Sequence, residues 1–171
     1  MPKPLKETIC EESIFTALFN KYAEDLYHFL HYKFGEQLNP KDKVQEAFIK
    51  LWENCAKTSP DKAKSFLFTI ANNLMLNEAA HRKVVLKYAS TKPKFYTNET
   101  PEFALREKEY MEKLQKALAN LTDAQRTAFL LNRVEGKKFK EIASLLDISV
   151  KAVEKRIYGA LTKLRNEING I

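Results

Sequence analysis

The chain has 171 residues, and its 29 Lys and Arg against 22 Asp and Glu give a net charge of +7 and a pI of about 9.3. Only four glycines and six prolines leave little room for a turn-rich β protein, so the composition predicts an all-α fold. The excess positive charge favours a polyanionic partner. The first ten residues lack the apolar core of a signal peptide and no apolar run reaches membrane-spanning length, so we expect a cytoplasmic protein.

The first predicted helix begins with the spacing of a capping box. Thr8 and Glu11 stand three residues apart, the separation at which each side chain can bond the other's backbone N–H. Apolar and aromatic residues then recur at helical spacing as far as Gly35. The aromatic side chains of this stripe are expected in the core, because each buries a large apolar area.

Two more helices are predicted before the chain loses its periodicity. Asn39 followed by Pro40 is typical of an N-cap and a first helical position. The apolar stripe of the helix that follows includes Trp52, which we also expect in the core. A polar segment, residues 54–65, precedes a third helix whose apolar stripe begins at Phe66.

The segment ASTKPKFYTNET, residues 89–100, has no hydrophobic period and mixes Pro, Thr, Ser and Asn, which is typical of a linker. The sequence therefore predicts two small helical domains, residues 8–88 and 103–171, joined by a flexible linker of residues 89–102. In the second domain Thr122 and Gln125 have the spacing of another capping box.

Two short helical patterns stand close together in GKKFKEIASLLDISVKAVEKRIYGALTKLR, residues 136–165. Only three residues separate them, and Ser149 can cap the second helix. Such a short connection makes the helices cross steeply, which predicts a helix-turn-helix. The alternative is a solvated basic helix in an ordinary bundle. Groups that can neutralise phosphates or reach base edges lie on the exposed face of the second helix: Lys151, Ala152, Lys155, Tyr158 and Thr162.

Three segments of the chain resemble parts of bacterial sigma factors. LTDAQRTAFLLNRVEGKKFKEIASLLDISVKAVEKRI, residues 121–157, resembles region four. DKVQEAFIKLWEN, residues 42–54, resembles the polymerase-binding helix of region two, and FLFTIANNL, residues 66–74, resembles the following segment that engages the promoter's −10 element. The order of these motifs and the compact chain resemble the extracytoplasmic-function (ECF) group of the sigma-70 family.

The resemblance implies a protein that binds core RNA polymerase and directs transcription from specific promoters. The implied polymerase-binding residues are Asp42, Gln45, Glu46 and Lys50. The implied −10 DNA contacts are Lys57, Lys62, Lys64, Asn73, Asn77, His81 and Arg82, with Asn72 a further candidate for a base edge. The implied −35 contacts are Lys151, Ala152, Lys155, Arg156 and Tyr158. The resemblance also implies an anti-sigma factor, often membrane-bound, as a partner; we expect no cofactor and no small-molecule substrate.

The sequence also shares features with two other classes of protein. A stand-alone repressor or activator explains the helix-turn-helix, and a helix over residues 103–118 could make it a dimer, but it leaves the two region-two motifs unexplained. Binding to core polymerase discriminates between the two.

An enzyme is the second rival, and the sequence contains no Gly-rich phosphate loop and no nucleophile elbow. His28 and His31, with Glu24 nearby, have a spacing that binds metal only weakly, so no metal site is predicted. The two cysteines, Cys10 and Cys55, suggest neither a disulfide framework nor a zinc cluster, and reduced thiols are expected.

Overall fold

The computed structural model describes residues 7–81 and 101–168, and in these ranges the chain forms helices and turns with no strand. The chain divides into two compact units, Met1–Val85 and Leu86–Ile171. The predicted all-α fold with two helical domains is therefore confirmed. Most of the predicted linker, residues 89–100, lies outside the described residues, as does Arg82.

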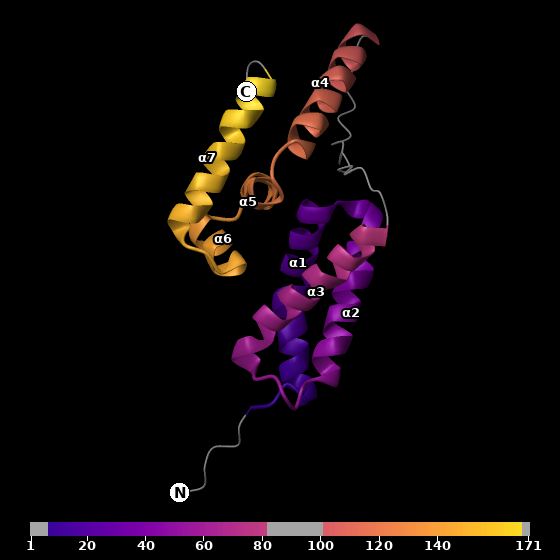
Figure 1. Ribbon diagram of the computed structural model, residues 1–171, viewed down its shortest axis with the longest axis vertical. Helices are drawn as coiled ribbons and strands as arrows, with labels where there is room; N and C mark the ends of the chain where they lie inside the picture. Colours follow the sequence, from indigo (N-terminus) through magenta and orange to yellow (C-terminus); the bar gives the residue numbers. More distant parts are fainter. Residues whose placement is uncertain (1–6, 82–100, 169–171) are drawn as a thin grey trace, which may run out of the picture. The chain divides into compact units, whose positions relative to one another are not determined.

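The first unit consists of α1 (Glu12–Phe34), α2 (Pro40–Glu53) and α3 (Ala63–His81), and each helix packs against the other two (Figure 1). Short 3-10 turns, Glu36–Leu38 and Pro60–Lys62, precede α2 and α3. The core is aromatic and aliphatic. The largest fully buried side chains of the three helices are Leu26, Leu30, Leu51, Leu67 and Met75.

The prediction that Trp52 lies in the core is wrong, because 45% of the residue is exposed. The buried stripe of α2 runs through Val44, Ala47, Phe48 and Leu51. Trp52 comes one residue after this stripe, so about 100° of helical rotation moves its side chain to the margin of the core. There its ring packs edge-on against Phe15, with centroids 5.1 Å apart.

The predicted capping box at the start of α1 is also absent. The Thr8 hydroxyl accepts a hydrogen bond from the Cys10 N–H (3.3 Å), and the Thr8 carbonyl accepts one from the Glu11 N–H (3.1 Å). Thr8 and Glu11 therefore close a turn ahead of the helix, whose N-cap, Glu11, has no side-chain cap. Ile9, fully buried in the core of the first unit, holds this turn in place.

The two cysteines are joined in a disulfide, contrary to the expected reduced thiols. Their Cα atoms lie 5.1 Å apart although 45 residues separate them in the sequence. The cause is tertiary: the buried Ile9 brings the N-terminal turn, and Cys10 with it, to the segment that follows α2.

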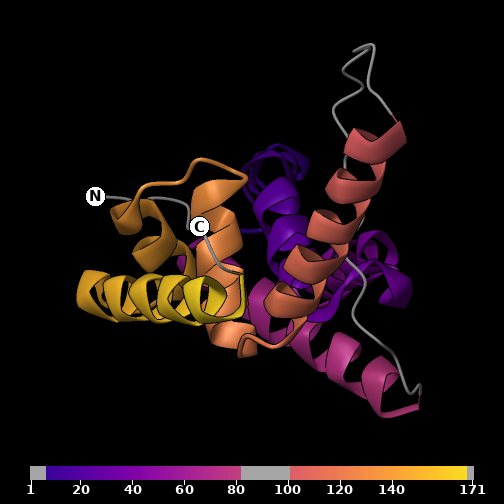
Figure 2. The ribbon, with the colours of Figure 1, turned by 90° about the horizontal axis from the view of Figure 1, so that it is seen from above.

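The second unit consists of α4 (Pro101–Ala119), α5 (Asp123–Arg133), α6 (Phe139–Leu146) and α7 (Val150–Glu167). α7 packs against each of the other three helices, and in both views α6 lies against the N-terminal end of α7 (Figures 1 and 2). The predicted helix-turn-helix is α6 and α7. Aliphatic side chains from all four helices contribute to the core, and the largest fully buried ones are Leu131, Ile142, Val153, Ile157 and Leu164.

The predicted caps of this unit are present. The Thr122 hydroxyl accepts from the Gln125 N–H (3.2 Å), and the Gln125 side chain accepts from the Thr122 N–H (3.4 Å). The Ser149 hydroxyl accepts from the Ala152 N–H (3.1 Å). Together these bonds fix where α5 and α7 begin.

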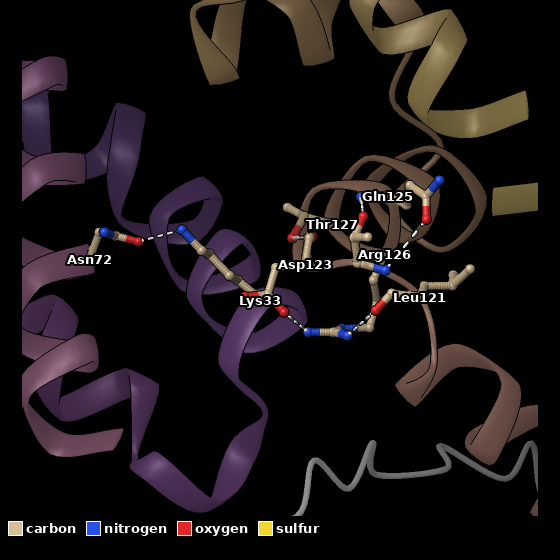
Figure 3. Close-up of polar contacts among 8 residues, drawn as sticks. Lys33, Asn72, Leu121, Asp123, Gln125, Arg126 and Thr127 are labelled. Atoms are coloured by element: carbon tan, nitrogen blue, oxygen red, sulfur yellow. Dashed lines mark hydrogen bonds and ion pairs between the residues drawn. The ribbon is translucent and has the colours of Figure 1, made fainter. Parts of the chain in front are cut away.

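A buried arginine joins the end of α4 to the start of α5. Arg126 is only 1% exposed, and its guanidinium donates to the Leu121 carbonyl (3.1 Å) and the Asp123 carboxylate (2.7 Å), as Figure 3 shows. Burial lowers the pKa of Arg126 to about 10, so the group is still charged at neutral pH. The two acceptors compensate a charge that would otherwise be costly to bury.

Candidate polymerase and nucleic-acid interfaces

The exposed side of α2 carries the predicted polymerase contacts. Asp42, Gln45 and Lys50 are exposed, whereas Glu46 is half-buried and forms an ion pair with Lys43 (3.1 Å). An i,i+3 pair at a surface contributes only about 0.2–0.5 kcal/mol, so it orients Glu46 more than it stabilises α2. Asp42 offers its carboxylate to solvent one turn before Glu46.

Two apolar residues extend this face, and sequence reasoning missed both. Ile49 is 57% exposed and Trp52 is 45% exposed. Asp42, Gln45, Ile49 and Trp52 follow one another at intervals of three and four residues, so they form one stripe. The signal was available in the sequence, because the core stripe of α2 fixes which positions point outward. We call these four residues the α2 face. It combines a charge, an amide and an exposed apolar area, a mixture that suits a protein partner.

A pocket of about 550 Å³ lies between the polar loop and the start of α3. Residues 57–62 provide one wall, with the ammonium groups of Lys57 and Lys62. The first turns of α3 provide the other, where Phe66 offers an aromatic ring and Thr69 a hydroxyl. We call it the α3 pocket, and its complete lining is Lys57, Thr58, Lys62, Ser65, Phe66, Thr69 and Ile70. An aromatic ring for stacking, hydroxyls for base edges and cations for phosphates are the groups that hold an unstacked nucleotide.

One carboxylate belongs to the same loop. The pKa of Asp61 is lowered, chiefly by a hydrogen bond from the Ser59 side chain, so Asp61 is ionised at neutral pH. Its charge opposes those of Lys57 and Lys62. The loop therefore attracts a polyanion less strongly than a count of its lysines suggests.

The predicted asparagines continue the face of α3 that lines the pocket. Phe66, Ile70, Asn73 and Asn77 are spaced by four, three and four residues, so they lie along one side of the helix. Asn73 and Asn77 are exposed. The structure thus brings the two asparagines into line with the pocket, and we call these four residues the α3 face.

The other predicted −10 contacts are more scattered. His81 is exposed at the last residue of α3, and Lys64 is half-buried. Asn72 does not share the α3 face. Its amide oxygen accepts a hydrogen bond of 2.6 Å from the Lys33 ammonium group (Figure 3). Asn72 therefore ties α3 to α1 rather than offering that oxygen to a base.

A shallow groove of about 480 Å³ runs along the start of α7. It brings together four of the five predicted −35 contacts, and Arg156, half-buried, is the one outside its lining. Tyr158 is 59% exposed, and its ring lies edge-on to Phe139 of α6, with centroids 6.3 Å apart. The lining residues are Ser149, Lys151, Ala152, Glu154, Lys155 and Tyr158.

Glu154 is a groove residue that sequence reasoning missed. It stands three residues after Lys151 and four before Tyr158, the same spacing rule that selected its neighbours. A carboxylate in the major groove can accept a hydrogen bond from cytosine N4 and is repelled by phosphates. The groove therefore contains groups suited to bases as well as groups suited to the backbone.

No helix in the described ranges is long and apolar enough to cross a membrane. Within residues 7–81 and 101–168, no group of three His, Cys, Asp or Glu side chains is placed to hold a metal ion.

Comparison with known families matches each unit separately. The family described as Sigma-70 region 2 matches residues 18–84, and the family described as Sigma-70, region 4 matches residues 111–164. The first match covers the α2 face and the pocket, and the second covers the helix-turn-helix.

Relatives match along most of the chain. The ECF RNA polymerase sigma factor SigE of Mycolicibacterium smegmatis is 26% identical over 154 residues, which are 87% of this chain but 59% of SigE. SigW of Bacillus subtilis, also an ECF RNA polymerase sigma factor, is 23% identical over 172 residues, 94% of this chain and 92% of SigW. CnrH, solved in complex with the cytosolic domain of CnrY, has a similar fold, with a TM-score of 0.55 and 24% identity over 91% of this chain and 88% of CnrH.

Proposed function

The chain belongs to the sigma-70 family, in its extracytoplasmic-function group, and on that premise we propose that it binds core RNA polymerase and directs promoter-specific transcription initiation. One observation carries the proposal: a single chain combines a region-two unit, with its exposed α2 face and its α3 pocket, and a helix-turn-helix with a basic groove. A stand-alone repressor or activator needs only the second of these.

In this proposal the first domain, residues 8–88, docks on polymerase and opens the −10 element. The α2 face supplies the docking contacts, with Glu46 and Lys50 at its edge. Extruding a base from the duplex costs a few kcal/mol of stacking and pairing, and the pocket beside Phe66 compensates part of that cost. The amides of Asn73 and Asn77 offer donors and acceptors to a base edge, whereas Lys57, Lys62, Lys64, His81 and Arg82 contact phosphates or stack.

The second domain, residues 103–171, binds duplex DNA at the −35 element. Lys151, Lys155 and Arg156 neutralise phosphates, while Ala152 and Tyr158 reach the groove floor. Two modest sites joined through the linker of residues 89–102 favour promoters that have both elements at the right separation. Polymerase fixes that separation when it holds both domains.

In this function the chain recognises other molecules and catalyses no covalent step. Its place of action is the cytoplasm, where core polymerase and promoter DNA are. An anti-sigma factor is a further proposed partner. The α2 face, with Ile49 and Trp52 exposed, is where such a partner would compete with polymerase.

The proposal is tested by run-off transcription with purified core polymerase on a promoter library. The full chain should redirect polymerase to a subset of promoters that share two short elements. The variant Asp42→Arg should bind polymerase at least about tenfold more weakly, because a reversed charge at an interface costs up to several kcal/mol. Its melting temperature should stay near that of the wild type, since Asp42 is exposed.

The matched control is Glu24→Arg, which makes the same reversal at an exposed position of α1. It should leave polymerase binding unchanged. If the Asp42→Arg variant captures core polymerase as well as the wild type does, the α2 face is not the docking site. A chain that leaves promoter selection by core polymerase unaltered would refute the proposed function itself.

A further inference from the structure

We propose that Cys10 and Cys55 are a reversible thiol oxidation site that controls how firmly the wall of the α3 pocket is held. Its effect on promoter opening rests on the proposed function, but the oxidation and its effect on the pocket wall do not. The oxidants it would take are peroxides and small disulfides such as oxidised glutathione. The two residues are the only cysteines of the chain, so no third thiol competes for either partner.

The disulfide connects two hydrogen-bonded turns, neither of which is part of a helix. Cys10 lies in the turn closed by Thr8 and Glu11. Cys55 lies two residues after the end of α2, and its N–H donates to the Trp52 carbonyl (3.2 Å). Backbone turns of this kind open far more readily than the middle of a packed helix. A covalent bond between them therefore restricts motion that hydrogen bonds alone permit.

The pocket wall begins two residues after Cys55. Lys57 and Thr58 line the pocket, and their N–H groups donate to the Asn54 carbonyl (3.0 and 3.1 Å). The Asn54 side chain in turn donates to the Lys50 carbonyl at the end of α2 (2.8 Å). Residues 54–58 are thus attached to α2 by only a few hydrogen bonds. The disulfide adds a second attachment, to a turn anchored by the fully buried Ile9.

The difference in exposure between the two cysteines determines which thiol is oxidised first. Cys10 is exposed and Cys55 is half-buried, so an oxidant reaches Cys10 first. The Cys10 thiolate attacks one oxygen of hydrogen peroxide, the O–O bond breaks, and the departing hydroxide is protonated to water. The Cys55 thiolate then attacks the sulfur of the Cys10 sulfenic acid, the S–O bond breaks, and a second water leaves. Two thiols lose two electrons and two protons, and one peroxide becomes two waters. With oxidised glutathione, the Cys10 thiolate attacks one glutathione sulfur and releases the other glutathione as a thiol, and the Cys55 thiolate then displaces the bound glutathione from Cys10, so one glutathione disulfide becomes two glutathione thiols.

The redox conditions of the cytoplasm determine when this disulfide forms. Glutathione and thioredoxin keep most cytoplasmic thiols reduced, and disulfides that form there are usually transient and redox-sensing. A chain that works beside polymerase therefore carries this pair reduced at rest and bonded under oxidation. In the bonded state the pocket wall is fixed and ready for an extruded base. In the reduced state the protein must order residues 54–58 when DNA binds, which slows promoter opening.

The first test needs no polymerase. The full chain is treated with hydrogen peroxide or oxidised glutathione, and then with dithiothreitol. Mass spectrometry should show the loss and return of two hydrogens within one chain. Amide hydrogen exchange at Lys57 and Thr58 should be severalfold slower in the bonded form. A pair that stays reduced under both oxidants, or exchange rates equal in the two forms, would overturn the proposal.

The second test adds core polymerase and a promoter with a fluorescent base in the −10 element. The bonded wild type should open it severalfold faster than the reduced form, while both bind −35 duplex DNA equally. The variants Cys10→Ser and Cys55→Ser cannot form the bond, so they should open the promoter at the rate of the reduced form with and without oxidant, which also controls for oxidised methionine. Equal opening by both wild-type forms overturns the redox proposal. If neither form opens the promoter, the proposed function is contradicted. Mass spectrometry and hydrogen exchange then still test whether the thiol pair is oxidised reversibly and whether the bond slows exchange in the pocket wall.

Discussion

The two units start their helices in different ways. In the second unit side chains bond the starts of the helices: Thr122 for α5, Glu141 for α6 and Ser149 for α7. At α6 the N-cap residue, Lys138, makes no side-chain cap. Instead the N3 residue caps the helix: the Glu141 carboxylate accepts from the Lys138 N–H at 2.7 Å. In the first unit the N-caps of α1 and α2 have no side-chain hydrogen bond.

Helix length explains why side-chain bonds matter at the starts of α5 and α6. α5 and α6 have 11 and 8 residues, fewer than the roughly 12–15 that even good helix formers need in isolation. A cap that contributes about 1 kcal/mol is then a large part of the stability of such a helix. The uncapped α1 has 23 residues, and its long apolar face supplies the stabilisation instead. The first unit is therefore fixed by packing, and the second also depends on local polar bonds.

The largest expected effect comes from the buried polar group of the second unit. Arg126→Ala leaves the Leu121 carbonyl and the Asp123 carboxylate without this donor and opens a cavity. The free energy of unfolding of the second unit should fall by about 3 kcal/mol. The first unit should unfold at an unchanged urea concentration. Far-UV circular dichroism during urea unfolding of the full chain measures both transitions.

The control for that variant is Arg133→Ala, which removes an exposed arginine from the same helix. It should cost no more than a few tenths of a kcal/mol. Since the Arg126 pKa of about 10 lies well above neutrality, the folded and unfolded chains bind this proton equally at neutral pH. The loss should therefore be constant between about pH 6 and 8. An Arg126→Ala protein as stable as the control would mean that the second unit is also fixed by packing alone.

The next effect concerns DNA and belongs to the first unit. Asn73→Ala removes an exposed amide from the α3 face without touching the core. Promoter opening should slow by about tenfold, or about 1.4 kcal/mol, because one good bidentate base contact is worth about 1–3 kcal/mol. Binding of −35 duplex DNA should not change. A fluorescent base in the −10 element reports opening directly.

Asn20→Ala, at an exposed position of α1, is the matched control and should open promoters normally. Normal opening by Asn73→Ala, with normal −10 preference, would move base recognition to the pocket beside Phe66. In that case Lys57 and Thr58 rather than the asparagines would set the specificity of the first unit.

A smaller effect separates the two kinds of helix start. Thr122→Ala removes the hydroxyl that caps α5 and should lower the free energy of unfolding by about 1 kcal/mol. Thr8→Ala makes the same chemical change where no cap exists and should cost only a few tenths, for one exposed turn hydrogen bond. Thermal unfolding of the full chain measures both. Equal losses would mean that the helix starts of the two units do not differ in energy.

This contrast also shows what the sequence could predict. The capping box at Thr122 and the N-cap at Ser149 were predicted correctly because the bonding partners lie within three residues of each other. The box at Thr8 was wrong although its spacing was the same. Burial of Ile9 decided the conformation there, and burial depends on helices that lie far away in the sequence.

The misses among the candidate site residues have the same origin. The disulfide of Cys10 with Cys55 and the exposure of Trp52 follow from tertiary neighbours, which spacing does not contain. The outward stripe of α2 could have been found by rotating the helix about its core positions. The proposed contacts with DNA and polymerase stay predictions, since composition and exposure show what a residue can offer and not what it meets.

The smallest expected effect tests whether duplex binding belongs to the second unit alone. Lys155→Ala removes one exposed cation from the groove of α7. If that group contacts a phosphate, the slope of log affinity against log salt for −35 duplex DNA should flatten by about one unit or less. Lys57→Ala removes an exposed cation from the pocket of the first unit and should leave this slope unchanged, because its proposed ligand is single-stranded. Fluorescence anisotropy of the full chain with labelled duplex, over a range of salt, gives both slopes. If Lys57→Ala flattens the slope as much as Lys155→Ala, both units hold the duplex and the division of labour fails. If neither variant changes it, the α7 lysine is only solvated, and the affinity comes from other basic groups of the second unit.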